Sequence, residues 1–286
     1  METRSEEECR PLIIGDYGQI LSICQEEKVD RIIVALDERR SKLPVEQLLS
    51  CRLKGIRVDD GMAFTEDLDG KLSVQNLYPS ALIFSDGFKK SSVFKRAKRY
   101  LDIVASAVGL LLSFPFCLLT ALAIKLNSEG PVLYSQERVG EDERRFYLLK
   151  FRSMRADAEE NGPVWAEPED ERVTRVGRVI RKLRFDEIPQ MLNVLWGDMS
   201  LVGPRPERSF FIEQLEKEIP YYSQRHMVKP GVTGWAQIRY PYGASKEDAL
   251  EKLKYDLYYI KHMSFLFDLT IIFETAKIVL LGKGAR

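Results

Sequence analysis

The sequence predicts an α/β part at the N-terminus and, after it, a mainly α, membrane-associated part with a small β element. Three observations support this fold class. Residues 11–88 alternate strand-like and helix-like segments, residues 103–124 are apolar and uncharged, and residues 127–286 are dominated by helical patterns around two short strand candidates. At 286 residues, the chain is long enough for two modest domains.

Composition excludes several classes of protein. Lys and Arg number 43, as do Asp and Glu, which disfavours a generally basic nucleic-acid binder and a generally acidic solvating chain. The balance is a cancellation, because residues 1–88 carry 17 acidic and 11 basic side chains while residues 89–286 carry 26 and 32. The four cysteines form no CxxC pair and lie far from both histidines, so a reducing compartment and no His/Cys zinc site are expected. The polar N-terminus predicts no secretory signal.

Residues 11–88 are expected to form parallel α/β units, because strand and helix patterns alternate there. A proline opens the second helix, which suits a first helical turn. No GxGxxG motif occurs, so a structural or regulatory role is favoured over a nucleotide site. The expected strands are Leu12–Ile14, Arg31–Leu36 and Lys54–Val58, and the expected helices are Tyr17–Glu27 and Pro44–Leu53.

The apolar run from Ile103 to Ile124 is the longest uncharged stretch of the chain. As a helix it would be ~33 Å long, enough for a hydrocarbon core of ~30 Å. Pro115 lies near its middle and removes a backbone donor, which predicts a kink or a break. Ser113 is placed to hydrogen-bond a carbonyl that the proline leaves without a donor.

Two membrane arrangements fit this run equally well on the residues alone. One is a plain spanning helix with a proline kink, and the other is a helix–break–helix that enters and leaves one face. Positive charge flanks both ends, as the second arrangement would show, and the positive-inside rule places that face in the cytoplasm. A buried soluble helix fits less well, because the run is too long for most such helices. The flanking residues are Lys95, Arg96, Lys98, Arg99 and Lys125.

The segment after the apolar run contains a β element and a cluster of cations. Val132–Tyr134 and Arg144–Phe151 are expected strands around the sequence VGEDE. Lys150 and Arg152 bracket the end of the second strand. An arginine-rich helix follows, whose spacing places three arginines near one face: Arg175, Arg178 and Arg181.

Asp186 and Glu187 are adjacent carboxylates immediately before a proline that suits a first helical turn. The helix is expected to continue to Trp196, where Gly197 ends it. The pair would lie at a positive helix end near several arginines, a setting that keeps a carboxylate ionised and favours an incoming phosphate. Arg205 lies between two prolines, which restrict its backbone, and its guanidinium suits bidentate phosphate binding.

Two carboxylates, several arginines and no nearby histidine fit phosphoryl transfer. A carboxylate then serves as nucleophile, and a hard cation on oxygen ligands neutralises the diphosphate. Taken singly, Asp186 is better explained as a helix cap and the arginines as part of a solvated helix face. Taken together, these residues favour a catalytic site. Serine hydrolases and metalloproteases have no motif here.

The C-terminal region leaves two interpretations open. Leu250–Met263 has apolar and aromatic residues at helical spacing with lysines between them, and Ser264–Leu281 is more apolar. Both patterns suit a headgroup interface and suit core packing. Lys229–Tyr240 is expected to be a loop in which Trp235 either shapes a nucleotide pocket or closes the domain.

Residues from about Lys95 to Arg286 resemble the catalytic domain of the bacterial sugar transferases, monotopic phosphoglycosyl transferases that act on polyprenyl phosphate. Six motifs in family order carry the resemblance: KRAKRYLDIVAS, LLLSFP, GPVLYSQERVG, YLLKFRSM, RKLRFDEIPQMLNVLWGDMSLVGPRPE and KPGVTGWAQI. Residues 11–88 resemble the tail of the Rossmann-like α/β domain of the large, undecaprenyl-phosphate glucose/galactose phosphotransferase-like members, and are expected to be a partial domain. One departure is Phe114 between Ser113 and Pro115, where some members have Ser next to Pro.

The resemblance implies a role for each site residue. Asp186 resembles the nucleophile that attacks the β-phosphate of a UDP-sugar, forms a phosphoglycosyl-aspartate and releases UMP; polyprenyl phosphate then attacks that intermediate. Glu187 resembles its partner in metal binding or proton handling, and both carboxylates are implied ligands of Mg²⁺. The implied phosphate-binding residues are Arg181, Arg205, Lys150 and Arg152.

The resemblance also implies an organisation. Residues 1–88 would be the partial α/β domain, 89–100 a basic linker, 101–126 a re-entrant membrane helix broken at Ser113 and Pro115, and 127–286 the catalytic domain. The expected location is the bacterial inner membrane, with the catalytic domain on its cytoplasmic face.

The expected partners are a UDP-sugar, polyprenyl phosphate, the membrane and a second copy in a homodimer, with no nucleic acid. The chain would then start the assembly of a cell-surface polysaccharide or glycan. The alternative function is a catalytically idle, membrane-anchored scaffold or sensor for polysaccharide assembly.

Overall fold

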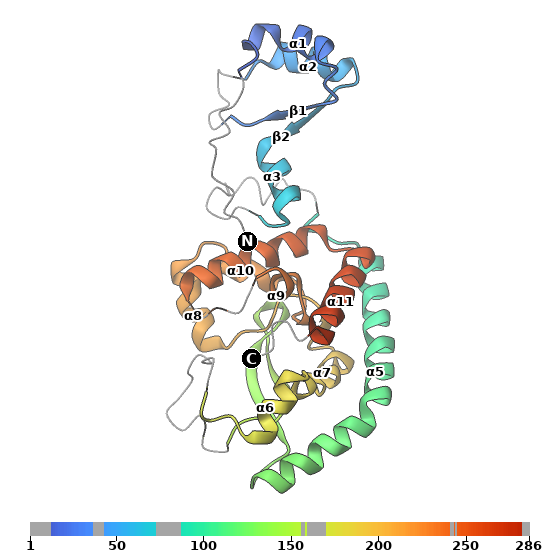
Figure 1. Cartoon of the computed structure of the whole chain (residues 1–286), viewed down its shortest axis with the longest axis vertical. Helices are drawn as coiled ribbons and strands as arrows, with labels where there is room; N and C mark the ends of the chain where they lie inside the picture. Colours follow the sequence, from blue (N-terminus) through green and yellow to red (C-terminus); the bar gives the residue numbers. More distant parts are fainter. Residues whose placement is uncertain are drawn as a thin grey trace, which may run out of the picture. The chain divides into compact units, whose positions relative to one another are not determined.

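A computed structural model describes residues 13–36, 43–72, 87–155, 158, 170–240, 243 and 245–281 (Figure 1). The chain divides into two compact units, Met1–Asp69 and Gly70–Arg286. Most of the described residues are helical, and the strands form small two-stranded sheets. The predicted mixture of helices with a small β element is therefore confirmed.

The first unit places three helices around a two-stranded parallel sheet with Arg31 opposite Arg57. Cys24, Leu48 and Cys51 are buried within it. The parallel pairing confirms the α/β prediction, but two strands do not confirm a Rossmann-like fold. The elements are η1 (Tyr17–Gln19), α1 (Ile20–Glu26), β1 (Arg31–Val34), α2 (Val45–Leu53), β2 (Arg57–Asp60) and α3 (Gly61–Asp69).

One expected strand of this unit was wrong, and another lies later in the sequence than expected. Ile13 and Ile14 are irregular and exposed, and Leu12 lies outside the described residues. The strand expected from Lys54 begins three residues later, because the Lys54 amide closes α2 and Gly55, at φ +89°, turns the chain.

The second unit contains the remaining elements. Its helices are α5 (Ser92–Asn127), α6 (Arg175–Lys182), α7 (Gln190–Trp196), α8 (Ser209–Glu218), α9 (Trp235–Arg239), α10 (Lys246–His262) and α11 (Phe265–Leu280), with short turns η2 (Glu141–Glu143), η3 (Phe185–Glu187) and η4 (Tyr222–Met227). Its strands are β3 (Leu133–Val139), β4 (Arg145–Phe151), β5 (Ser200–Val202) and β6 (Gly231–Thr233). The β3–β4 hairpin is antiparallel as expected, and β5 and β6 pair in parallel.

The main core of this unit forms around α10. Leu253, Leu257 and Ile260 are fully buried, so α10 packs in the core and its apolar face is not at a headgroup interface. Helix α11 differs, because Ile271 is buried while large apolar side chains on its other faces are exposed. These are Leu266, Leu269, Ile272 and Phe273.

The segment expected to be a loop around Trp235 forms β6 and α9. The indole Nε1 of Trp235 donates to the carbonyl of Gly70 at 2.7 Å, and the ring packs edge-on against Phe267. Trp235 therefore closes the domain, and the alternative, a nucleotide pocket shaped by this ring, is not supported.

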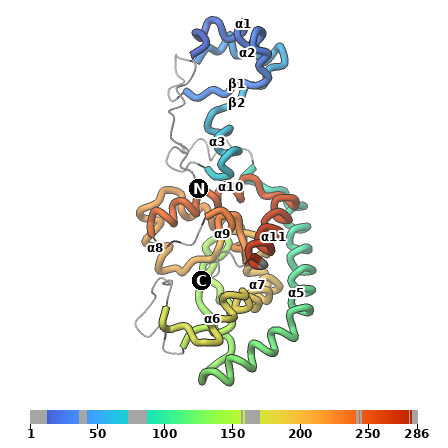
Figure 2. Tube along the Cα trace, in the orientation of Figure 1, coloured from blue at the N-terminus to red at the C-terminus, as the bar shows by residue number. Residues whose placement is uncertain are grey.

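Helix α5 is the one helix of the described residues that is long and apolar enough to cross a membrane. Only 11% of its most apolar window is buried. Pro115 lies inside the helix, and the ribbon and the Cα trace change direction along its length (Figures 1 and 2). The Ser113 hydroxyl donates to the carbonyl of Leu110 at 3.3 Å, one residue before the carbonyl that Pro115 deprives of a donor.

The basic segment before the apolar run is part of α5, which begins at Ser92. Arg99 donates to the carbonyls of Val194 and Leu195 in the last turn of α7, the latter at 2.7 Å. A guanidinium satisfies carbonyl groups that the end of a helix leaves without intrahelical donors. The start of α5 is thereby attached to α7.

Two further residues attach α5 to the second unit. Lys98 forms an ion pair of 2.6 Å with Asp268 of α11, whose other oxygen accepts from Tyr259 at 2.7 Å. Asp102 is buried and accepts from the backbone amide of Leu201 in β5 at 3.1 Å. Lys98 and Arg99 therefore bind protein groups, although their positions also flank the apolar run.

Helix α7 is joined to the hairpin by one amide side chain. Asn193 is fully buried; its oxygen accepts from Leu149 N at 3.0 Å and its nitrogen donates to Tyr147 O at 2.7 Å. These bonds extend the edge of β4 as a neighbouring strand would. The segment immediately before α7 is consequently held against β4.

Candidate active site

Asp186 and Glu187 form the short turn η3 between α6 and α7. Arg184 precedes it in the left-handed conformation, at φ +58°, and this residue turns the chain between α6 and η3. Both carboxylates are largely buried. The expected helix is thus confirmed from Gln190, while the dyad occupies a tighter turn just before it.

Glu187 is the centre of a group of cations from three parts of the unit. Its Oε1 accepts from Arg205 Nη2 at 2.7 Å and lies 3.3 Å from Lys150 Nζ on β4. Its Oε2 lies 3.9 Å from Arg184 Nη1. Burial alone would raise the pKa of Glu187, but Arg205 and Lys150 hold it well below its ordinary value. Glu187 is therefore a permanent anion at neutral pH.

Asp186 has a different environment. The residue is 8% exposed, and its carboxylate forms no hydrogen bond or ion pair with any described residue. Burial raises the pKa of Asp186, and the Glu187 carboxylate raises it further; Lys150, Arg181 and Arg205 oppose the shift. Unpaired lone pairs on a desolvated carboxylate favour a nucleophile over a structural ion-pair partner.

The four expected phosphate-binding cations do not all lie at the dyad. Lys150 and Arg205 contact Glu187, and Arg181 is close enough to oppose the rise in the pKa of Asp186, while its Nε donates to Ser153 Oγ at 2.8 Å. Arg152 is buried elsewhere. It donates to the carbonyls of Ser128 and Glu129, at 2.9 and 2.7 Å, where α5 ends.

The carboxylates fit a magnesium ion unequally. Mg²⁺ is usually held by one or two carboxylates together with substrate phosphates and water. Asp186 offers oxygens that no described residue uses, whereas Oε1 of Glu187 already contacts Arg205 and Lys150. The donor set therefore fits an ion that is held by Asp186 and by the phosphates of a bound substrate.

A second buried ion pair, between Arg225 and Asp256, holds the backbone of Arg205 in place. It was not predicted from the sequence. Arg225 Nη2 donates to the carbonyl of Arg205 at 2.9 Å and to Asp256 Oδ2 at 2.8 Å, while Nη1 donates to Tyr222 at 2.6 Å. Burial raises the pKa of Asp256 to about 6, although Arg225 opposes the shift. A signal existed, because Asp256 lies on α10 among fully buried apolar residues.

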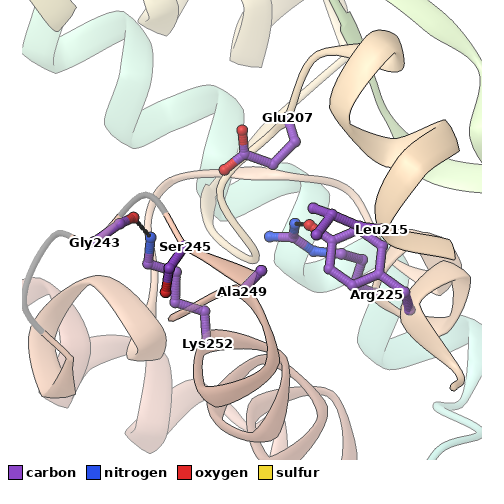
Figure 3. A pocket seen from close by; sticks show the side chains of 8 residues that line it. Glu207, Leu215, Arg225, Gly243, Ser245, Ala249 and Lys252 are labelled. Atoms are coloured by element: carbon purple, nitrogen blue, oxygen red, sulfur yellow. Dashed lines mark hydrogen bonds between the residues drawn. The ribbon is translucent and has the colours of Figure 1, made fainter. Parts of the chain in front are cut away.

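A small pocket lies beside this ion pair (Figure 3). The side chains of Glu207 and Arg225 extend into it, whereas Lys252 extends toward Gly243, whose carbonyl accepts a hydrogen bond from Lys252 Nζ at 2.6 Å. Its lining also includes Leu215, Tyr222, Ser245 and Ala249. Arg225 thus lines this pocket and also contacts the backbone of Arg205, which pairs with Glu187.

Comparison with known proteins identifies relatives of the whole chain. The family model for the bacterial sugar transferases matches residues 93–282. The chain is 44% identical over 239 residues to a UDP-N-acetylgalactosamine-undecaprenyl-phosphate N-acetylgalactosaminephosphotransferase of Aeromonas hydrophila, covering 84% of this chain and 56% of the relative. It is 36% identical over 278 residues to the UDP-glucose:undecaprenyl-phosphate glucose-1-phosphate transferase of Escherichia coli (strain K12), covering 95% and 59%.

A shorter relative is matched over almost its whole length. The exopolysaccharide production protein PSS of Rhizobium leguminosarum bv. phaseoli is 42% identical over 197 residues, which are 65% of this chain and 97% of that protein. The chain spans slightly more than half the length of the first two relatives.

We expect Asp256→Ala to lower the free energy of unfolding by about 3–5 kcal/mol, because it leaves Arg225 buried without its partner. Chemical denaturation of the purified chain measures this change. The double variant Arg225→Met/Asp256→Leu removes both charges and should be clearly more stable than the single variant. Equal stability of the two would contradict the assignment of a buried ion pair.

Proposed function

The chain belongs to the bacterial sugar transferase family, and we propose that it transfers a sugar-1-phosphate from a UDP-sugar to polyprenyl phosphate with release of UMP. One observation carries this proposal: the buried carboxylate of Asp186, which has no hydrogen-bond partner among the described residues, lies next to a Glu187 that is paired with Arg205 and Lys150. The names of the relatives support the substrate classes.

In the proposed reaction, an oxygen of Asp186 attacks the β-phosphorus of the UDP-sugar. A bond forms between that oxygen and the phosphorus, while the bond to the bridging oxygen breaks and UMP leaves with that oxygen. A phosphate oxygen of the polyprenyl phosphate then attacks the same phosphorus and releases Asp186. The covalent step divides one transfer between two anionic substrates into two displacements.

The neighbouring residues would prepare these displacements. Arg205, Lys150 and Arg181 supply positive charge where a diphosphate accumulates negative charge. Glu187 holds Arg205 and Lys150 in place before substrate arrives, which is the kind of preorganisation that lowers a barrier. Arg152 would act only indirectly, by holding the turn after α5.

Magnesium is part of the proposal. Asp186 would hold the Mg²⁺ ion, which would supply positive charge to neutralise the diphosphate. The paired state of Glu187 favours a role in holding cations over direct ligation of the metal.

We further propose that α5 is re-entrant at Ser113 and Pro115, and that the catalytic domain, residues 127–286, lies on the cytoplasmic face of the bacterial inner membrane. The interior proline, the bend and the exposed apolar surface support this placement. Residues 89–100 would belong to the same anchoring element. Residues 1–88 would form a Rossmann-like α/β domain with a regulatory or structural role, and homodimerisation is proposed from the resemblance.

We expect the purified chain, supplied with Mg²⁺ and polyprenyl phosphate in vesicles, to release UMP from at least one UDP-sugar of a panel. Asp186→Asn should reduce the rate by at least about 1,000-fold, because an amide oxygen is a poor nucleophile. Glu213→Gln, an exposed change on α8, is the control. Release at the wild-type rate by Asp186→Asn would refute the nucleophile, and no release from any UDP-sugar would favour the idle scaffold.

The pH dependence should identify Asp186 as the group that limits activity in acid. Its pKa is raised, so lowering the pH protonates it while Glu187, whose pKa is lowered, stays ionised. Glu187→Gln removes the charge that raises the pKa of Asp186 and releases Arg205 and Lys150 to lower it. We expect the acid limb of the UMP-release profile to move down by about 1 pH unit or more. An unmoved or upward-shifted limb would contradict the coupling.

Re-entry predicts that both ends of the apolar helix lie on one side of the membrane. Tyr100 and Leu126 are exposed, so a cysteine at either position should be reactive once the native cysteines are replaced. In sealed vesicles, an impermeant maleimide should label both positions or neither. Labelling of only one would instead support a plain spanning helix.

A further inference from the structure

Three side chains that can bind a metal converge outside the residues assigned above. Glu143 ends η2 in the β3–β4 turn, Glu216 lies on α8 and His226 lies on η4. One carboxylate oxygen of each glutamate and one ring nitrogen of His226 all lie within 4.8 Å of one another. Three separate elements of the second unit therefore contribute to one cluster.

His226 is a buried polar side chain with a ring nitrogen that has no hydrogen-bond partner among the described residues. The side chain is 7% exposed, and its Nδ1 is buried without a hydrogen-bond partner in the described part of the chain. Buried polar atoms in native proteins nearly always have a partner, because leaving one unpaired is costly. One ring nitrogen of this buried side chain faces the two carboxylates, so an ion at the centre of the cluster would give the imidazole a partner.

The carboxylates of Glu143 and Glu216 have no cationic partner among the described residues. Neither carboxylate forms an ion pair or a hydrogen bond with a side chain or backbone group of the described residues, and each places a negative charge close to the other. Burial raises the pKa of Glu216, and the carboxylates of Glu143 and Glu213 raise it further. Close carboxylates repel each other unless a cation lies between them.

We propose that Glu143, Glu216 and His226 bind a divalent transition-metal ion of the zinc type, at a site separate from the Asp186–Glu187 dyad. Imidazole nitrogen with carboxylate oxygen is a donor set that suits Zn²⁺ and Co²⁺, whereas Mg²⁺ prefers oxygen ligands. The glutamate side chains are exposed and flexible, so small rotations bring their oxygens to coordination distance. Three protein ligands leave a fourth position for water.

The bound ion would hold η2, α8 and η4 together. His226 directly follows Arg225, whose guanidinium donates to the carbonyl of Arg205. The ion would therefore stabilise the segment that supports Arg205, as a structural element that does not touch the substrates. The site itself does not depend on the proposed transferase activity.

The test uses Co²⁺ as the probe, because its visible spectrum reports its ligands. The full chain is purified in detergent, stripped with a chelator and titrated with Co²⁺ in excess Mg²⁺, which fills oxygen-only sites. We expect saturable binding of one equivalent, displaced by Zn²⁺, without the intense near-ultraviolet band of a thiolate ligand. Glu143→Gln and Glu216→Gln should each weaken binding at least about tenfold.

The matched control is Glu218→Gln, which removes an exposed carboxylate from the same helix; Glu218 pairs with Lys246 and is not among the charges that act on Glu216. It should bind Co²⁺ like the wild type, and Zn²⁺ should raise its thermal unfolding temperature but not that of Glu216→Gln. Three outcomes would overturn the proposal: no saturable binding, binding that neither glutamine variant weakens, or a thiolate band that places the ion at the cysteines.

Discussion

The pairing of Glu187 with its cations is the interaction on which the geometry of the catalytic unit depends. Positive charges stabilise a buried ionised carboxylate, and for Glu187 they come from β4, from the residue Arg184 after α6 and from the segment after β5. These parts must therefore meet at one point. Because the cations contact Glu187, the carboxylate of Asp186 is desolvated and has no partner in the described part of the chain. The pKa values of the two neighbouring carboxylates are therefore shifted in opposite directions.

Much of this site could be predicted from local sequence. Prolines, glycines and periodicity place Asp186 and Glu187 before α7 and Lys150 in the hairpin, because those signals act over a few residues. The direction in which each cationic side chain points depends on packing between segments that are far apart in the sequence. The sequence therefore did not distinguish Lys150, which lies at the dyad, from Arg152, which binds the turn after α5.

Other features depend on contacts that no local pattern records. Arg225 and Asp256 lie 31 residues apart and meet only because α10 packs beneath η4. Amphipathic patterns showed that α10 has an apolar face but not whether lipid or protein covers it. The composition argued only against a zinc site of His and Cys, and it left open donors as common as glutamate.

The attachment of α5 has a geometric consequence for chemistry at a membrane. Arg99 and Asp102 join the helix to α7 and β5, and 13 residues separate Asp102 from Pro115, a rise of roughly 20 Å. In the proposed placement, this length of helix fixes the distance between the bilayer and the nucleophile Asp186. Inserting one residue there would shift the proline by about 1.5 Å and rotate it by about 100°. The helical register of a lipid-facing segment would thereby set how far a lipid phosphate must rise to reach Asp186.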